Sequence, residues 1–352
     1  MGDHADDLEF EEIHRSLGSD YLRVLGYQPT SNRKERLKMT TLTNGQLSRA
    51  RRVGGAMPPR RIDLNGSIAK STGDLPPRII IHGAGGMGKT SLASHFKNPI
   101  FVLSPGETGL LTLQDNGLVD PSIPHFQFDD GNGGVTHSCS IWEEALSAVD
   151  ALTTQDHDYK TVVFDVMNGF EKLCQEYVCE KHFGGNWGIE EKKGFDSYGA
   201  GYKVTLPEWT QFIQLLGNLR DRRRMTVVGL CHTGVSLFKN PEGPDYDRYV
   251  PDMHDRAWKY LSGQFDIVLF LHRYVAAEKE RGTSKAKGKG GIERLIEVET
   301  TAAWDAKNRH GMSDPISMGN SSEEAWKNLV SAMTQAKKEA IARQKSKEGT
   351  AS

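Results

Sequence analysis

The sequence has few cysteines, no long hydrophobic run and no excess of one charge. Its 352 residues include 4 cysteines, and the formal net charge is −2. The cysteines form no CxxC pair and accompany no histidine cluster, which favours reduced structural thiols over the alternative of a zinc site. No apolar run reaches the roughly 18 residues of a membrane-spanning helix, and the N-terminus is acidic, unlike a secretory signal. We therefore expect a cytoplasmic protein whose nucleic-acid contacts, if any, are local.

The most informative segment is 83–90, which fits the phosphate-binding pattern GxxxxGK[ST]. Residues 78–82 before it predict a buried strand, and residues 91–96 after it predict the start of a helix. Backbone amides of the loop and the helix N-terminus would surround nucleotide phosphates, with Lys89 reaching the β- and γ-phosphates. We expect ATP and Mg²⁺ as ligands. The predicted binding residues are Gly83, Ala84, Gly85, Gly86, Met87, Gly88, Lys89, Thr90 and Ser91.

A second predicted strand, residues 161–165, is apolar and ends in Asp165. A carboxylate at the end of a buried strand downstream of a phosphate loop commonly holds Mg²⁺. We expect Asp165 and the Thr90 hydroxyl to hold the metal. The alternative for Asp165 is a helix-capping role.

Hydrolysis also needs a group that orients or deprotonates water. Glu107 follows the predicted strand 100–103, and parallel strands bind ligands beyond their carboxyl ends. Glu171, one turn into the helix after Asp165, is a second candidate base, with a solvated helix position as its alternative. His232 follows the predicted strand 225–230 and is a candidate sensor of the γ-phosphate; its alternative is a structural histidine.

Strand and helix patterns alternate from residue 78 onward. Continuous apolar strands between helices predict an α/β fold of the P-loop NTPase type, with a mostly parallel central sheet and helices on both faces. We expect an N-terminal extension (1–75), an ATPase core (76–320), and a C-terminal helix with a basic tail (321–352). Further expected strands are 125–128 and 266–271, and expected helices begin at capping boxes at 140–143 and 205–208 and at Ser321.

The N-terminal extension has poor apolar periodicity. Residues 1–20 are acidic, whereas residues 31–61 carry nine Lys/Arg against Glu35 alone. The pattern is typical of a disordered or loosely helical extension, and the alternative is a basic arm that contacts DNA phosphates.

Two segments predict contacts with single-stranded DNA. Residues 183–202 combine glycines with Trp187, Phe195, Tyr198 and Tyr202, and exposed aromatic rings of this kind stack on bases. The alternative is a glycine loop whose aromatic side chains pack inward. The second segment is 233–256, and a basic hairpin tip at 281–291 is a further candidate for phosphate contacts.

Lys307 and Arg309 lie two residues apart on a predicted extended segment, so both side chains should point to the same side. Two cations in this arrangement suit a clamp on a γ-phosphate, supplied by the same chain or by a neighbouring subunit.

Taken in order, these motifs from about Arg78 to Leu329 resemble the phage-type RecA-like ATPases, which include short recombinases that anneal single strands. The resemblance rests on the phosphate loop, Glu107–Leu110, Asp165, Gly199–Tyr202, Cys231–Thr233, Pro244–Tyr249 and Ala306–Gly311. The last segment is similar to the Lys-Asn-Arg-Phe-Gly motif of bacterial RadA, with His310 in place of Phe. Val166 departs from the Thr or Ser that is common after the strand aspartate.

The resemblance implies an ATPase that hydrolyses ATP and acts on single-stranded DNA in recombination, annealing or repair. It implies Glu107 as catalytic base, and Lys307 and Arg309 as ATP contacts across the interfaces of a homo-oligomer. A single-stranded-DNA-binding protein would be a further partner, and the location would be the host cytoplasm if the chain is phage-encoded. The rival hypotheses are a P-loop phosphotransferase and a nucleotide-dependent switch or scaffold.

Overall fold

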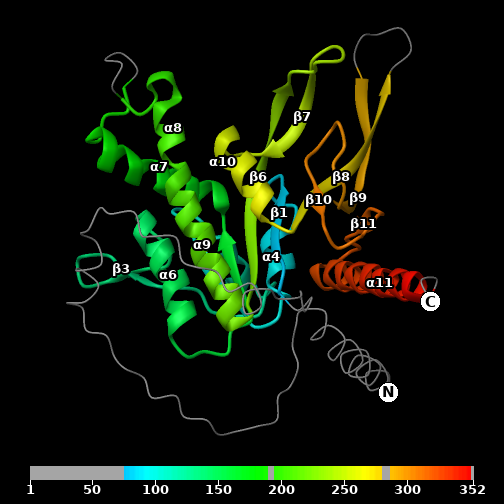
Figure 1. Cartoon of the computed structure of the whole chain (residues 1–352), viewed down its shortest axis with the longest axis horizontal. Helices are drawn as coiled ribbons and strands as arrows, with labels where there is room; N and C mark the ends of the chain where they lie inside the picture. The colour runs from blue at the N-terminus through cyan, green and yellow to red at the C-terminus, as the bar shows by residue number, and fades with distance from the viewer. Residues whose placement is uncertain (1–74, 189–193, 280–285, 350–352) are drawn as a thin grey trace, which may run out of the picture.

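The computed structural model describes residues 75–188, 194–279 and 286–349 (Figure 1). Within them, helices cover both faces of a mostly parallel sheet, which confirms the predicted α/β class. Nearly all of the expected extension at 1–75 lies outside the described residues, as does part of the tip at 281–291, and the expected domain boundaries stay predictions. No helix of the described ranges is both long and apolar enough to span a membrane.

Five parallel strands form one side of the sheet, in the order β8-β1-β6-β5-β2, with β2 as the outermost strand. The strand before the glycine loop (β1) and the strand that ends in Asp165 (β5) are therefore separated by β6. Because parallel strands end at the same side, we call that side the carboxyl edge and the opposite side the amino edge. The strands are β1 Arg78–Gly83, β2 Pro99–Leu103, β5 Thr161–Asp165, β6 Thr226–Phe238 and β8 Ile267–Lys279.

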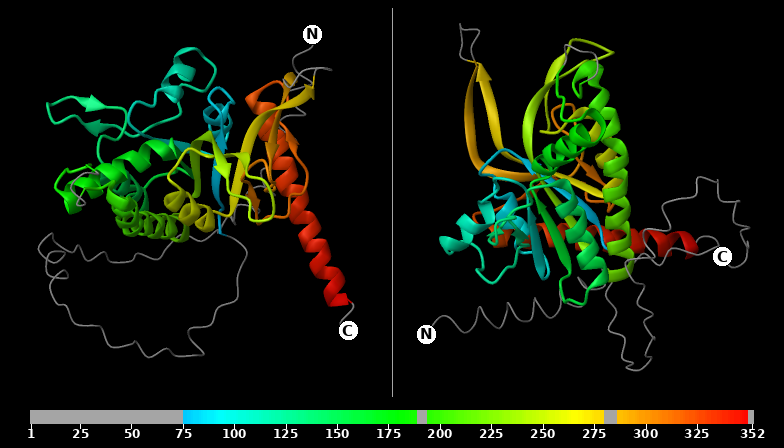
Figure 2. Two further views of the ribbon diagram at one scale, coloured as in Figure 1. Left: turned by 90° about the horizontal axis from the view of Figure 1, so that it is seen from above. Right: turned by 90° about the vertical axis from the view of Figure 1, so that its left-hand side faces the viewer.

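Helices pack on the two faces because the side chains of the strands alternate (Figure 2). In β1, Ile80 packs with one helix layer, whereas Ile79 and Ile81 pack with the other. The first layer contains α6 Trp142–Thr154, α7 Met167–Phe183, α9 Leu206–Arg223 and α10 Asp255–Gln264. The second contains α4 Lys89–Ala93, α5 Gly109–Asp115 and α11 Ser322–Gly349.

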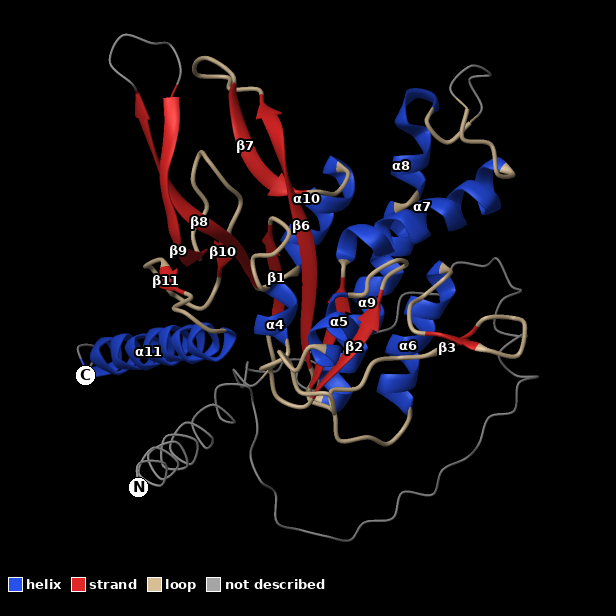
Figure 3. Cartoon of the chain, turned by 180° about the vertical axis from the view of Figure 1, so that it is seen from behind, coloured by secondary structure: helices blue, strands red, loops and turns tan. Residues whose placement is uncertain are grey.

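Strands β6 and β8 continue past the carboxyl edge as two hairpins (Figure 3). Their partners are β7 Tyr246–Pro251 and β9 Ala286–Glu297, and β8 and β9 also pair with β10 Lys307–Asn308 and β11 Ile316–Ser317, respectively. The strand predicted at 225–230 was therefore too short, and much of the segment 233–256 predicted as a loop is a hairpin. In the extension of β6, apolar Val235 and Leu237 alternate with small or polar residues, so the continuous apolar run of a buried strand is missing.

Two capping predictions were wrong in detail. At the start of α6, Glu144 rather than Glu143 accepts hydrogen bonds from the amides of Ser140 (2.6 Å) and Ile141 (3.3 Å). The helix begins one residue later than expected, so the acceptor position moves with it.

At the start of α9, the Thr205 hydroxyl donates to the Tyr202 carbonyl (3.1 Å) rather than accepting from the helix. The short helix α8 Ala200–Val204 ends directly before Thr205. Thr205 therefore keeps a helical backbone conformation instead of the extended one that an N-cap residue adopts. The cap of α11 is as predicted, because the Ser321 hydroxyl accepts from the Glu324 amide (3.1 Å).

The strand expected at 125–128 is reduced to a single bridge between His125 and Phe101, and a small ribbon of β3 Phe128–Asp129 and β4 Val135–Thr136. The cysteines were interpreted correctly as free and structural thiols, since all four are unpaired and buried: Cys139, Cys174, Cys179 and Cys231.

Candidate active site

The glycine loop leaves β1 at the carboxyl edge and turns directly into α4. Gly86 and Gly88 have φ values of 73° and 92°, in the left-handed region that side chains other than glycine rarely adopt. The helix begins at Lys89, two residues before the expected start, and is only 5 residues long. The loop geometry, more than a helix dipole, therefore shapes this part of the site.

Lys89 lies folded back under the loop. Its Nζ donates to the carbonyls of Gly83 (2.9 Å) and Ala84 (3.0 Å) and lies 3.5 Å from Nδ1 of His232. Burial lowers the pKa of Lys89, and the negative charges of Asp165 and Glu107 oppose that shift. The ammonium group is thus held in a pocket of loop carbonyls beside two carboxylates.

Asp165 ends β5 and is buried, with 1% of its surface exposed. Its Oδ2 accepts a hydrogen bond from the Thr90 hydroxyl at 2.9 Å, so the two predicted metal ligands lie together. Burial, followed by the nearby charge of Glu107, raises the pKa of Asp165 to about 7. A hydroxyl and a carboxylate that share a buried, negatively charged corner are a donor set that fits Mg²⁺.

Glu107 follows β2, whose last residue, Leu103, is paired with Asp165. The Glu107 carboxylate accepts from the Gly109 amide (2.7 Å), and a methyl group built on Gly109 would lie 3.6 Å from the Thr90 hydroxyl. The parallel order of β2 and β5 therefore brings this half-buried carboxylate beside Thr90 and Asp165.

His232 lies opposite Gly83 in the register of β1 and β6. His232 was predicted to follow the end of its strand, but β6 continues to Phe238. The residue lies at the point where β6 leaves the parallel sheet. Burial and then the charge of Lys89 lower the pKa of His232, which favours a neutral ring. Its amide donates to Oδ1 of Asn168 (3.2 Å).

Asn168 was missed by the sequence interpretation. It lies in the first turn of α7 directly after β5, and a polar residue three positions beyond Asp165 was the available signal. Glu171, the second candidate base, is buried rather than solvated. Its carboxylate accepts from the His254 amide at 3.0 and 3.1 Å and so fixes the start of α10. Burial raises its pKa to about 7.

A family model described as an AAA domain matches residues 75–310 of the chain. The chain belongs to the AAA domain family. That membership agrees with the loop, the strand aspartate and the α/β sheet, and it makes the chain a P-loop NTPase-type protein.

Other comparisons add little to the assignment of this AAA domain. The crystal structure of the RadB recombinase is similar, with 14% identity and a TM-score of 0.34, over 62% of this chain and 86% of that one. A TM-score this low carries no argument about function. No curated protein matches the chain.

Lys307 and Arg309 lie at the amino edge of the AAA domain, away from the loop. Lys307 pairs with Val268 of β8, whereas Gly83 pairs with Leu271, roughly 10 Å further along the same strand. Within one chain the two side chains are therefore bound away from the loop, which favours the neighbouring-subunit alternative for the clamp.

Both cations make contacts at the end of α10. Lys307 donates to the carbonyls of Ser262 (2.7 Å) and Phe265 (2.8 Å), and Arg309 lies 3.6 Å from the Asp266 carboxylate. Both also contact the Gly263 carbonyl, so their side chains do point to the same side. The Arg309 side chain is 55% exposed, which leaves it more accessible to a neighbouring subunit than Lys307.

The aromatic side chains of 183–202 were expected either to be exposed for stacking on bases or to pack inward, and the structure shows some of each. Phe195 is fully buried, and Tyr202 stacks on His254 with ring centres 3.8 Å apart. Trp187 packs on Phe195 but stays 41% exposed, and Tyr198 is 82% exposed. Residues 189–193 lie outside the described part of the chain.

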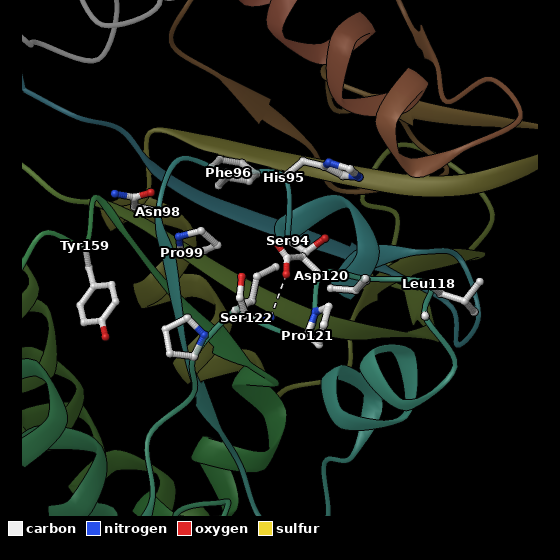
Figure 4. Close-up of a pocket in the computed structure, with 14 residues that line it drawn as sticks. Ser94, His95, Phe96, Asn98, Pro99, Leu118, Asp120, Pro121, Ser122 and Tyr159 are labelled. Carbon is white, nitrogen blue, oxygen red and sulfur yellow. Dashed lines mark hydrogen bonds between the residues drawn. The ribbon is translucent and has the colours of Figure 1, made fainter. Parts of the chain in front are cut away.

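A pocket of about 880 Å³ lies at the amino edge, beside the start of β2 (Figure 4). Its lining includes the carboxylate of Asp120, whose pKa is lowered by hydrogen bonds from Ser122, but no lysine or arginine. A pocket with a fixed anion and no cationic side chain of that kind repels phosphate, so it does not compete with the loop as a nucleotide site.

Proposed function

We propose that this AAA domain is a RecA-like ATPase that binds Mg²⁺–ATP, hydrolyses it, and acts on single-stranded DNA in recombination, annealing or repair. The observation that carries the proposal is the meeting of Lys89, Thr90, Asp165 and Glu107 at the carboxyl edge. The order of motifs along the chain, rather than the likeness to RadB, supports the RecA-like assignment.

The residues divide the chemistry among them. Amides of the loop and the Lys89 ammonium would bind the phosphate oxygens, and Thr90 and Asp165 would hold Mg²⁺, whose positive charge would offset the negative charge of the phosphates. Glu107 orients a water molecule and accepts its proton as the water oxygen attacks the γ-phosphorus. The bond from the γ-phosphorus to the bridging oxygen breaks, and ADP and inorganic phosphate are formed.

His232 is suited to sense the γ-phosphate, because its ring lies 3.5 Å from Lys89 and its strand continues into the β6–β7 hairpin. A shift of the ring on hydrolysis would be transmitted along one continuous strand. We propose this strand as the connection between the nucleotide and the DNA.

The proposed DNA surface comprises the loop 183–202 and the two hairpins beyond the carboxyl edge. Exposed rings at Tyr198, Tyr249 and Tyr274 support stacking on bases, which tolerates any sequence. The basic segment 281–291 would add phosphate contacts, although its side chains lie largely outside the described part.

We further propose that the protein assembles into a homo-oligomer with ATP at the subunit interfaces. The location of Arg309 at the amino edge supports only a contact in trans. Lys307 is a weaker candidate for that contact, because its Nζ is held by backbone carbonyls.

The test is the rate of phosphate release from Mg²⁺–ATP, with and without single-stranded DNA at low salt. We expect stimulation by DNA. Binding of ATP without phosphate release would favour the switch or scaffold, and transfer of phosphate to an acceptor other than water would favour the phosphotransferase. Hydrolysis that is indifferent to DNA, together with no DNA binding, would refute the DNA part of the proposal.

A further inference from the structure

Arg294 lies beside the phosphate-binding loop, although no motif points to it. A methyl group built at Gly88 would lie 3.5 Å from Nη1 of Arg294 and 3.9 Å from Cε of Met318. Gly88 directly precedes Lys89 in the loop. A guanidinium group and a thioether therefore flank the loop on a side where the sequence predicted nothing.

The sheet explains this position. Ile296 of β9 pairs with Leu271 of β8, which in turn pairs with Gly83 at the end of β1. Arg294 precedes Ile296 by two residues in an antiparallel strand, so it lies beyond the carboxyl edge, on the same face as Ile296. Ile296 packs in the core that α4 and α11 cover, which directs Arg294 towards the loop face.

The Arg294 side chain is held in place by the chain before α11. Its Nη2 donates to the Gly319 carbonyl (3.2 Å), and its own carbonyl accepts from the Met318 amide (2.9 Å). The start of α11 is bound to the end of α4 in turn, through a 2.9 Å hydrogen bond between His95 and Ser322. A half-buried guanidinium with fixed neighbours loses little freedom when it binds a ligand.

The two flanks of the loop differ in charge. Asp165 is in β5, on one side of β1, and Arg294 is in β9, on the other side. The metal and the γ-phosphate belong on the flank of Asp165 and Glu107. A nucleotide that crosses the loop in an extended conformation therefore has its α-phosphate and nucleoside on the flank of Arg294.

We propose that Arg294 binds, within the same chain, the half of the nucleotide that lies away from the metal, with the α-phosphate as its charged contact. A planar guanidinium suits this role because it can bind phosphate oxygens with two parallel hydrogen bonds. The inference rests on the proposed nucleotide site but not on hydrolysis or DNA binding. It names a residue that contributes equally to ADP and ATP.

Calorimetric titration of the full chain with Mg²⁺–ADP and with Mg²⁺–AMP-PNP tests the inference. In Arg294→Gln, which removes the charge but keeps a donor for the Gly319 carbonyl, we expect both dissociation constants to rise about tenfold. Arg294→Lys, which keeps the charge, should lose less. The matched control is Arg222→Gln, because Arg222 is an exposed arginine at the end of α9, at the amino edge.

Unchanged affinities in folded Arg294→Gln and Arg294→Lys proteins would overturn the inference. A loss confined to AMP-PNP would also overturn it, since the contact would then be with the γ-phosphate. A wild-type protein that bound ADP but hydrolysed nothing would refute the proposed ATPase while leaving Arg294 testable. A wild-type protein that bound neither nucleotide would refute both.

Discussion

The two edges of the parallel sheet both carry cations, but their surroundings differ. At the carboxyl edge, Lys89 lies beside the carboxylates of Asp165 and Glu107 and under a loop with glycines in left-handed conformations. At the amino edge, Lys307 caps the last carbonyls of α10, and Arg309 lies beside Asp266. Lys89, Lys307 and Arg309 are all long cationic side chains, so residue type does not separate them. The contacts that the fold supplies decide which of them can bind a phosphate.

The largest effect is expected at the carboxyl edge. Lys89→Ala should weaken Mg²⁺–ATP binding about 100-fold or more, because a charge-assisted contact to two phosphates is lost. Calorimetric titration measures the loss. The exposed Lys259→Ala on α10 is the control. An equal loss of affinity in both variants would show that Lys89 makes no specific contact with the nucleotide.

Glu107→Gln should reduce phosphate release by a factor of about 10² to 10⁴, since the proton acceptor for water is removed. ATP affinity should stay within about twofold, because the neutral side chain still fits beside Gly109. Single-turnover hydrolysis and titration separate the two quantities. Undiminished hydrolysis would show that Glu107 is not the catalytic base and that another residue accepts the proton.

Acid should lower the contribution that His82, near the carboxyl edge, makes to the free energy of unfolding. Its Nε2 donates to the Asp305 carbonyl (2.7 Å), its Nδ1 lies 2.9 Å from the Thr233 hydroxyl, and burial lowers its pKa from 6.5 to about 4. Between these values the unfolded chain binds a proton that the folded chain does not. The His82 contribution to the free energy of unfolding should therefore rise by about 3 kcal/mol from pH 4 to 6.5 and then level off, whereas Asp165 and Glu171, whose pKa values burial raises to about 7, contribute with the opposite sign in that range.

Denaturant unfolding across this pH range measures that contribution. The difference in free energy of unfolding between the wild type and His82→Gln should grow with pH over this range, whereas the exposed His182→Gln should follow the wild type. A difference between the wild type and His82→Gln that does not change with pH would exclude His82 from the pH dependence.

The amino edge should respond in stability rather than in nucleotide binding. Lys307→Ala should lower the free energy of unfolding by about 1–3 kcal/mol, because buried carbonyls at the end of α10 lose their donor. Arg309→Ala should cost less than about 1 kcal/mol, since its ion pair is half-exposed. Thermal or denaturant unfolding of both variants gives the comparison.

A mixing experiment tests whether the amino edge also takes part in the nucleotide site. If Arg309 completes the site of a neighbouring subunit, Lys89→Ala and Arg309→Ala proteins should each be inactive and regain part of the ATPase rate when mixed. An Arg309→Ala protein with full activity would make the amino edge purely structural.

The smallest effect is expected on the hairpins. Tyr249→Ala should weaken single-stranded DNA binding by about 1–2 kcal/mol, because one stacking ring is removed. Fluorescence anisotropy with a labelled oligonucleotide measures it, and Phe128→Ala on the separate β3–β4 ribbon is the control. Equal affinities in the two variants would exclude the β6–β7 hairpin from the DNA surface.

Local patterns pointed to residues that the structure brings together. Lys89, Thr90 and Asp165 follow from a glycine pattern and an apolar strand, and Glu107 from the rule that parallel strands end together. Lys307 could not be understood in this way, because the carbonyls that it caps come from a helix over 40 residues earlier in the chain. For Phe195 the sequence left base stacking and inward packing open, and its burial against Phe183 and Tyr202 decides for packing.

The sequence by itself determined the α/β class, the loop and the strand aspartate, because each is visible as a pattern along the chain: the alternation of strand and helix segments, a glycine motif and one apolar run. The tertiary structure decided the strand order, the length of both hairpins and the partners of Glu171, Lys307 and Arg309. It also brought Arg294 to Gly88, through β8, β9 and the start of α11. Such contacts depend on how distant strands pair and pack, and spacing along the chain does not encode them.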